Sequence, residues 1–197
     1  MEEIQKIIDI EAQAIKNIPV TSSFLDAVEL IYEQVHKKGG KLITSGMGKA
    51  GQIAHNISTT FSSTGTPAVF LHPSEAQHGD LGIIRKNDVL LLISNSGKTR
   101  EILELIDLTE NLVPGTKSIV ITSNAESELG KLAHVAILTG NPPEVCPLDL
   151  SPTTSTTTMT VIGDVLVVLL MKKINFTKED YAKRHHGGYL GTKSRMK

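Results

Sequence analysis

Residues 89–102, V-L-L-L-I-S-N-S-G-K-T-R-E-I, carry the clearest structural signal in the chain. The apolar run predicts a buried strand, and apolar residues then recur at helical spacing at Ile102, Leu105, Ile106 and Leu112. A helix start presents unpaired N–H groups and the positive end of its dipole. The hydroxyl-rich turn between strand and helix therefore predicts a phosphate site.

Three hydroxyls, on Ser94, Ser96 and Thr99, flank Gly97 in this turn. A plain helix cap needs only one hydroxyl, so the excess favours phosphate binding. Ordinary turn chemistry is the alternative explanation.

Outward from this stretch, apolar strands alternate with helical patterns. Because parallel strands need crossover connections, the alternation predicts an α/β class protein. We expect a five-stranded parallel sheet in an α/β/α sandwich, preceded by N-terminal helices. The predicted strands are 41–44, 67–71, 88–94, 117–122 and 134–139; the helices are 48–62, 99–112, 127–133, 154–173 and 178–183, with loops over 72–80 and 140–152.

The chain of 197 residues fits one domain. Within it we expect N-terminal helices over 1–38, an α/β core over 39–175 and a C-terminal arm over 176–197. Ligands sit at the carboxyl ends of parallel strands, so segments 45–49, 72–78 and 94–99 should lie along one edge of the sheet.

Composition excludes several classes of protein. The net charge of −1 lacks the basic excess typical of nucleic-acid binding. No unbroken apolar run approaches the ~20 residues that span a bilayer, and the N-terminus does not resemble a signal peptide. The single cysteine, Cys146, fits a reducing compartment. We therefore expect a cytoplasmic protein with no nucleic-acid or membrane partner.

Two further segments follow strand ends. In G-M-G-K, residues 46–49, glycine lets the backbone approach a ligand, and Lys49 would complement a phosphate or an oxyanion. An ordinary glycine-rich turn is the alternative. Segment 72–80 holds two histidines and two acids but lacks metal-binding spacing, so acid–base chemistry or polar substrate contact fits it better than a metal.

Three features lie towards the C-terminus. Prolines around Glu144 would fix a carboxylate, as a general base requires, although an exposed loop glutamate is the alternative. Hydroxyls at Thr153 and Thr154 crowd a helix start, where they cap it or contact an anion. His185 and His186 belong either to a tail or to an arm that enters a neighbouring subunit's site.

Together these motifs resemble the sugar isomerase (SIS) domain family, and within it the arabinose 5-phosphate isomerases. The matching segments are G-M-G-K-A-G (46–51), H-P-S-E-A-Q-H-G-D-L-G (72–82), S-N-S-G-K-T-R-E-I (94–102), E-V-C-P-L-D-L-S-P-T-T-S-T-T (144–157), G-D-V-L (163–166) and H-H-G-G-Y-L-G (185–191). The resemblance covers essentially the whole chain. It implies a homotetramer with shared sites that interconverts D-ribulose 5-phosphate and D-arabinose 5-phosphate for Kdo biosynthesis, without a cofactor or a metal.

The resemblance also assigns residues. It implies a catalytic set of Lys49, His78, Glu101, Glu144 and His185. It implies substrate or phosphate contacts from Ser45, Gly46, Ser94, Asn95, Ser96, Thr99, Thr153 and Thr154. Glu144 or His185 would be the proton-transfer base, Lys49 would stabilise enediolate charge, and Glu101 would orient Lys49 or a sugar hydroxyl.

Two departures from the family pattern matter. Relatives often continue into paired CBS domains, whereas this chain ends at Lys197, which implies a short form without that regulation. The family's H-P-G-G is H-H-G-G here, and alignment on the glycines favours His185 over His186. Another SIS phosphosugar isomerase, acting on 3-hexulose 6-phosphate or sedoheptulose 7-phosphate, and a non-catalytic sugar-phosphate sensor are the alternatives.

Overall fold

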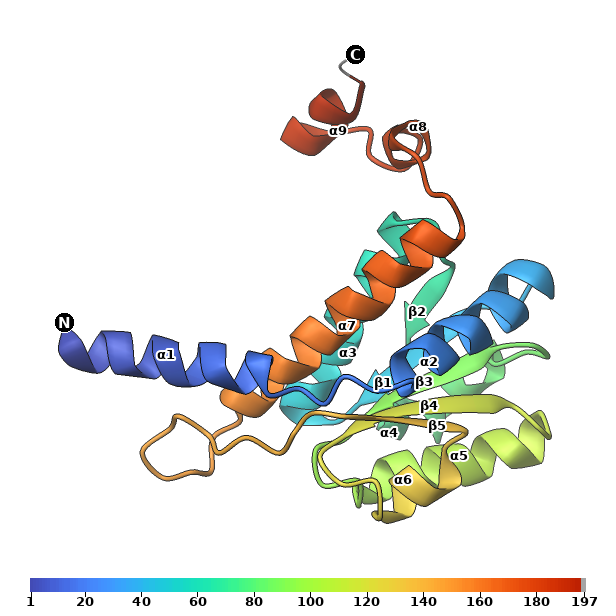
Figure 1. Ribbon diagram of the computed structural model, residues 1–197. Helices are drawn as coiled ribbons and strands as arrows, with labels where there is room; N and C mark the ends of the chain where they lie inside the picture. The colour runs from blue at the N-terminus through green and yellow to red at the C-terminus, as the bar shows by residue number, and fades with distance from the viewer. Residues whose placement is uncertain (196–197) are drawn as a thin grey trace.

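The computed structural model describes residues 1–195, so the last two residues of the predicted 176–197 arm lie outside the described residues. Its centre is a five-stranded, wholly parallel sheet with strand order β2-β1-β3-β4-β5 (Figure 1). This confirms the predicted fold class. The strands are β1 (Leu42–Gly46), β2 (Ala68–Phe70), β3 (Val89–Ile93), β4 (Lys117–Thr122) and β5 (Val135–Leu138).

Helices cover both faces of the sheet (Figure 1). One face carries α2 (Ser23–Ile31), α3 (Gly48–Ser63) and α7 (Thr154–Lys173), with α1 (Glu2–Lys16) lying against α7 and the π-helix η1 (Tyr32–Lys37) continuing α2. The other face carries α4 (Pro73–Ala76), the 3-10 helix η2 (Asp80–Ile83), α5 (Arg100–Leu112) and α6 (Glu128–Leu132). The chain continues through α8 (Lys178–Ala182) and α9 (Gly188–Arg195), which pack on each other.

The side chains of β3 point alternately to the two faces of the sheet, and each face has its own hydrophobic core. Leu91 and Ile93 join a cluster with α2, α3 and α7, whereas Leu90 and Leu92 join a second cluster with α5 and α6. All of these side chains are buried. Successive strand residues point to opposite faces, so a continuous apolar strand requires cover on both sides. The apolar run of the sequence therefore dictates the sandwich.

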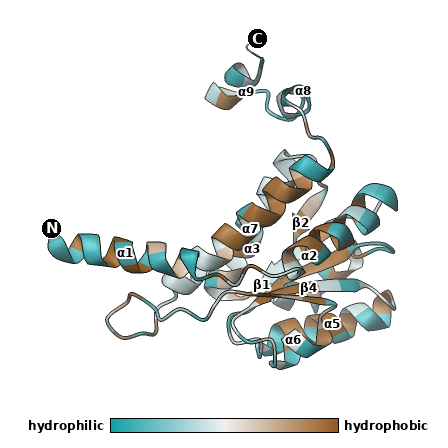
Figure 2. Ribbon diagram, viewed as in Figure 1, coloured by the Kyte–Doolittle hydropathy of each residue, from teal (hydrophilic) through white to brown (hydrophobic). Residues whose placement is uncertain are grey.

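Helix α7 packs closely along α3. A Cβ added at Gly163 would lie 2.5 Å from the Cδ1 of Ile57, so glycine permits this close approach. Among the described helices, α7 alone is long and apolar enough to cross a membrane, with a mean hydropathy of 1.6. Half of that stretch is buried, and its buried apolar side chains share one core cluster with those of α3. Figure 2 shows that α7 is hydrophobic over most of its length. A buried core helix meets the same criteria, so this is weak evidence for a membrane span.

Two segments contain more helix than we predicted. The 72–80 loop contains α4, where Pro73 occupies the first helical position that proline tolerates, and the start of η2. The segment after His186 forms α9, although glycines at 187, 188 and 191 conceal any helical pattern. In both places tertiary packing overrides local propensity: α4 packs on α5, and α9 packs on α8.

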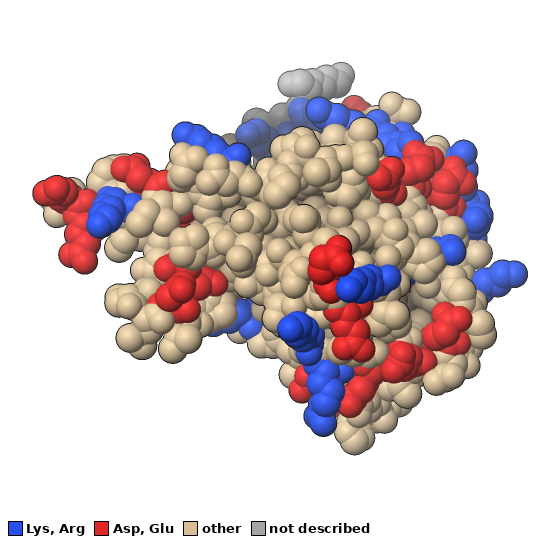
Figure 3. All heavy atoms as spheres, turned by 60° about the horizontal axis from the view of Figure 1, so that its bottom comes forward, with Lys and Arg blue, Asp and Glu red and all other residues tan. Residues whose placement is uncertain are grey.

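Helix α1 carries large apolar side chains that the rest of the chain does not cover. Ile4 and Ile8 are 56% and 53% exposed, and Ala14 is the buried residue of this helix. Figure 1 shows the N-terminal half of α1 extending away from the sheet. Figure 3 shows acidic and basic side chains mixed over one face of the molecule, without a single field of one sign.

We expect Gly163→Leu to destabilise the fold by about 1–3 kcal/mol, because the new side chain overpacks the contact with α3. Thermal unfolding should show a fall in Tm of roughly 2–4 °C per kcal/mol. Adding Ile57→Ala should recover part of the loss, since it makes room at the same contact. If the losses in the free energy of unfolding from the two substitutions simply add, the two positions are not in close contact and the prediction is wrong.

Candidate functional site

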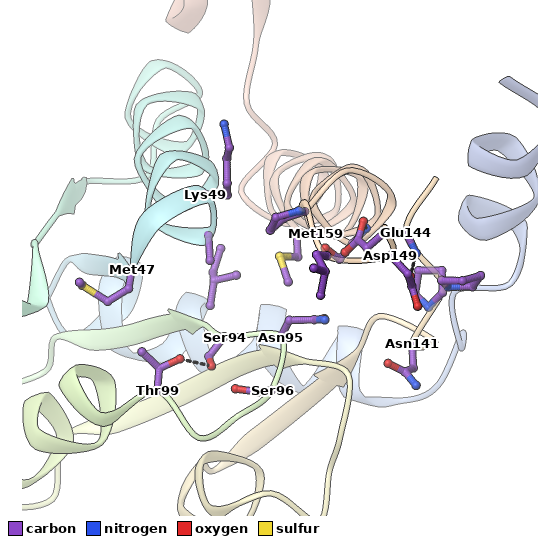
Figure 4. Close-up of a pocket in the computed structure, with 17 residues that line it drawn as sticks. Met47, Lys49, Ser94, Asn95, Ser96, Thr99, Asn141, Glu144, Asp149 and Met159 are labelled. Atoms are coloured by element: carbon purple, nitrogen blue, oxygen red, sulfur yellow. Dashed lines mark hydrogen bonds between the residues drawn. The ribbon is translucent and has the colours of Figure 1, made fainter. Parts of the chain in front are cut away.

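A cavity of about 650 Å³ lies at the carboxyl ends of β1 and β3 (Figure 4). These neighbouring strands have crossovers in opposite directions, since β2 lies beside β1 and β4 beside β3. Ligands occupy such switch points in open α/β sheets. The residues that line the cavity are Met47, Lys49, Ala50, Ile93, Ser94, Asn95, Ser96, Thr99, Asn141, Pro142, Pro143, Glu144, Asp149, Leu150, Pro152, Ser155 and Met159.

Three helices begin at this cavity. The N-caps of α3, α5 and α7 are Met47, Thr99 and Thr153, and none of them makes a side-chain cap hydrogen bond. Each helix therefore directs N–H groups and the positive end of its dipole towards the same region. This convergence favours an anionic ligand.

Contacts with residues that follow β4 fix the position of the loop between β3 and α5. Gly97 has φ +63°, and a Cβ there would lie 2.0 Å from the Oγ of Ser127, so only glycine fits. The carbonyl of Asn95 accepts hydrogen bonds from the N–H and the hydroxyl of Ser123 at 2.9 and 2.8 Å. These contacts hold the loop against the end of β4 and fix the hydroxyls above it.

The hydroxyls of this loop have different surroundings. Ser94 is buried; its Oγ lies 2.7 Å from the Oγ1 of Thr99 and accepts the Gly97 N–H at 3.2 Å. Ser96 is exposed, and its Oγ accepts the Lys98 N–H at 3.2 Å. Figure 4 shows the Ser94–Thr99 pair on the cavity wall. Ser94 thus orders the turn, while Ser96 has its hydroxyl open to a ligand.

Glu144 lies across the cavity from this loop (Figure 4). Its Oε2 accepts hydrogen bonds from the Thr153 N–H at 2.7 Å, the Thr153 hydroxyl at 2.9 Å and the Ser155 N–H at 3.2 Å. The carboxylate therefore caps α7. Burial raises the pKa of Glu144, but the hydrogen bonds from Ser155 and Thr153 outweigh it and hold the pKa below its ordinary value. Oε1 accepts no hydrogen bond from the described residues.

The loop that carries Glu144 is closed by two further contacts. Asp149 Oδ1 accepts the Glu144 N–H at 2.8 Å, and Cys146 Sγ accepts the Ser151 N–H at 3.3 Å. Backbone hydrogen bonds from Leu150, Ser151 and Leu148 lower the pKa of the Cys146 thiol to about 7. The loop thus holds one carboxylate, Glu144, in a fixed position and a second, Asp149, beside it.

The cavity is consequently polarised. The carboxylates of Glu144 and Asp149 lie on one side, and the hydroxyls of Ser94, Ser96 and Thr99 with the start of α5 lie on the other (Figure 4). Lys49 lines the rim, exposed, and extends away from the Ser94–Thr99 pair. Such an arrangement can hold an anion at one end of a ligand and exchange a proton at the other.

Six of the predicted site residues meet in this cavity: Lys49, Ser94, Asn95, Ser96, Thr99 and Glu144. Four others are not among the lining residues. Ser45 is buried and donates to the Leu71 carbonyl at 2.7 Å, Thr153 and Thr154 hold the Glu144 loop, and Glu101 is the second residue of α5. The predicted substrate contacts of Ser45, Thr153 and Thr154 would require their side chains to turn away from these partners.

The remaining three predicted residues lie elsewhere. Gly46 lines a smaller neighbouring cavity with His55 and His72. His78 is exposed beyond α4. His185 stacks on Tyr181 in the arm, with ring centroids 3.6 Å apart. A single copy of the described chain therefore does not bring either predicted histidine to the cavity.

Sequence reasoning missed several lining residues. Asn141 and Asp149 come from the irregular 140–152 loop, which has no periodicity to interpret. Ser155 was hidden in a run of threonines, although its position in the first turn of a predicted helix is a usable signal. In residues 1–195, no three His, Cys, Asp or Glu side chains lie together as metal ligands.

Comparison with known proteins decides the family. The SIS domain model matches residues 34–169. The chain belongs to the SIS domain family. The match spans the sheet, the β3–α5 loop and the start of α7, so all three helix N-termini at the cavity belong to the SIS domain.

Three relatives narrow the comparison. The SIS protein is 44% identical to arabinose 5-phosphate isomerase KdsD of Yersinia pestis over 96% of this chain and 56% of that protein, so it spans about half that relative's length. A crystal structure of a candidate phosphosugar isomerase involved in capsule formation, from Bacteroides fragilis, is 66% identical, with a TM-score of 0.94, and covers 95% of this chain and 98% of its own. An Escherichia coli CFT073 protein in complex with arabinose 5-phosphate is 33% identical, with a TM-score of 0.86, over 92% and 95% of the two chains.

We expect Ser96→Ala to weaken binding of inorganic phosphate by about tenfold or more, because a hydrogen bond to a charged group contributes roughly 1.5–3 kcal/mol. Isothermal titration calorimetry measures this directly. Ser22→Ala is the matched control, since Ser22 is exposed and makes no cap hydrogen bond. Unchanged affinity in Ser96→Ala would remove that hydroxyl from the anion site.

The lowered pKa of Glu144 predicts a pH dependence of stability. A carboxyl whose folded-state pKa is depressed stabilises the fold above its unfolded pKa and loses that contribution as pH falls through the folded pKa. Glu144→Gln should therefore lower the free energy of unfolding most near neutral pH. Urea unfolding measured from neutral to acidic pH gives the difference in the free energy of unfolding between Glu144→Gln and the wild type. This difference should shrink as the pH falls below the ordinary pKa of a carboxyl group. A difference that stays constant with pH would contradict the prediction.

Proposed function

We propose that this protein is an aldose–ketose isomerase that interconverts D-ribulose 5-phosphate and D-arabinose 5-phosphate. The observation that carries the proposal is one cavity that combines an uncapped helix N-terminus with a rigidly held carboxylate. The isomerase name of the Yersinia relative and the arabinose 5-phosphate bound to the Escherichia relative support the choice of substrate.

The reaction moves a proton between C1 and C2 through an enediolate intermediate. In the proposal, Ser96 and the start of α5 hold the phosphate, which places the carbonyl end of the sugar towards Glu144. Anchoring the substrate in this way makes proton transfer effectively intramolecular, and such positioning contributes ~7–11 kcal/mol. The hydrogen bonds from Thr153 and Ser155 favour the charged form of Glu144 and fix its position, so a carboxylate is available there as a proton acceptor.

Glu144 and His185 remain the two candidates for the base, with the other handling hydroxyl protons. We assign Lys49 to stabilise enediolate charge and Glu101 to orient Lys49 or a sugar hydroxyl. Lys49 reaches these atoms only after its side chain swings inward from its exposed position. His78 completes the proposed set.

The proposal includes a homotetramer with shared sites. The arm formed by α8 and α9 stands away from the body of its own chain (Figure 1). His185 lies on this arm, so it would reach the cavity of a second copy rather than its own. We further propose a cytoplasmic location and a role in supplying Kdo biosynthesis; the capsule assignment of the Bacteroides relative is compatible with such a polymer.

Two alternatives differ in what they require of the cavity. Another phosphosugar isomerase would use the same anchor but a differently shaped sugar end. A non-catalytic sensor would need the anchor alone, and the rigid support of Glu144 gives no advantage to a sensor. A shared fold does not separate these functions, whereas turnover does.

The test is incubation of purified protein with ribulose 5-phosphate in D₂O without added cofactor. We expect arabinose 5-phosphate, with deuterium at the carbon next to the carbonyl, detected by NMR. Binding without turnover would support the sensor. Turnover of only a different ketose phosphate would identify the other isomerase.

Glu144→Gln should lower kcat by about 10²- to 10⁴-fold, the range for loss of a general base, while KM changes little. Glu126→Gln, an exposed glutamate paired with Lys131 away from the cavity, is the control. Unchanged turnover in Glu144→Gln would remove Glu144 from the chemistry and leave His185 as the base.

A further inference from the structure

A chain of hydrogen bonds connects α1 to the loop that carries Glu144. The hydroxyl of Thr154 donates to Oε1 of Glu11 at 3.1 Å. The same hydroxyl accepts the backbone N–H of Val145 at 3.1 Å. Val145 directly follows Glu144, so Glu11 on the first helix is two hydrogen bonds away from the main chain of the candidate base.

The direction of these bonds is fixed by donor counting. A carboxylate only accepts, and a hydroxyl has one proton. Once Thr154 gives its proton to Glu11, its lone pairs face the Val145 N–H, which can only donate. Glu11 therefore sets the orientation in which Thr154 supports the loop. Thr154 is fully buried, so its hydroxyl cannot turn towards solvent instead.

The partial burial of Glu11 has a cost in free energy. Its Oε2 is buried and has no hydrogen-bond partner in the described structure. An unsatisfied buried oxygen costs roughly 1–3 kcal/mol. Most of α1 is exposed, with Ala14 as its buried residue, so this helix places one carboxylate against the start of α7 and buries little else.

The result is a carboxylate held from two sides. Thr153 and Ser155 fix Oε2 of Glu144, while Asp149 and Thr154 fix the N–H groups of Glu144 and Val145. Glu11 does not line the cavity. We propose that Glu11 is a positioning residue that holds the Glu144 loop, through Thr154, in the geometry needed for proton transfer. This inference rests on the proposed isomerase function.

The first test compares Glu11→Met, which removes the acceptor, with Glu11→Gln, whose amide oxygen keeps it. Glu11→Met should lower kcat by about 10- to 100-fold, since a displacement of roughly 1 Å at a catalytic group costs that much, and leave KM within about twofold. Glu11→Gln should restore most of the activity. Glu3→Met, exposed on the same helix, is the control and should match the wild type.

A second pair of variants leaves α1 untouched. Thr154→Val removes the hydroxyl with the same shape, whereas Thr154→Ser keeps it. Thr154→Val should reproduce the loss of kcat seen in Glu11→Met, and Thr154→Ser should not. This pair keeps the test valid if Glu11→Met fails to fold, which its Tm would reveal.

The decisive measurement is the same Glu11→Met change in a Glu144→Gln background. If Glu11 acts through Glu144, its effect on kcat should nearly vanish there, because coupled residues are not additive. Glu11→Met could instead lower kcat in that background by the same factor as in the wild type, or raise KM by a similar factor. Either result would overturn the positioning role and leave only a structural one.

Hydrogen–deuterium exchange separates this inference from the proposed function. Glu11→Met should accelerate exchange in peptides covering residues 141–153, while exchange around the β3–α5 loop stays unchanged. If the wild-type protein shows no isomerase activity, the proposed function fails, and faster exchange would still establish the support of the loop. Unchanged exchange at 141–153 would overturn the inference whatever the activity.

Discussion

Parallel pairing of all five strands is the constraint on which the rest of the molecule depends. Because every strand runs the same way, every strand-to-helix turn comes to one edge of the sheet. The starts of α3 and α5 meet there although they lie far apart in the sequence, and the long loop after β5 brings the start of α7 beside them. The strand topology therefore determines where the cavity forms, and particular side chains determine only its lining.

The helix ends at the cavity are used in two different ways. At α7 the positive end is satisfied by the protein's own Glu144, which is thereby ionised and immobile. At α5 the N-cap Thr99 turns its hydroxyl towards Ser94 instead of the helix backbone, so that end stays open to a ligand. A helix start whose N-cap residue makes no side-chain hydrogen bond therefore holds a carboxylate at α7 and leaves open N–H groups at α5.

Much of the fold could be predicted because strong periodicity coincided with clear breaks. Val89–Ile93 is apolar on both faces, and Thr99 stands at the start of α5 as expected. The 140–152 loop could not be predicted in the same way, since its shape depends on hydrogen bonds between residues such as Glu144 and Asp149 that no local pattern encodes. The residues of the β3–α5 loop, which are adjacent in the sequence, could be grouped from the sequence alone. Glu11 could not be, because 143 positions separate it from Thr154.

The surroundings of Cys146 have a practical consequence. It is the single cysteine of the chain, and backbone hydrogen bonds lower the pKa of its thiol to about 7, so this thiol ionises more readily than an ordinary cysteine. An alkylating fluorophore would attach at one position, two residues from Glu144, in the native sequence. The loop that carries Glu144 thereby has its own attachment point for a reporter, and ligand entry could be followed in real time without engineering a new thiol.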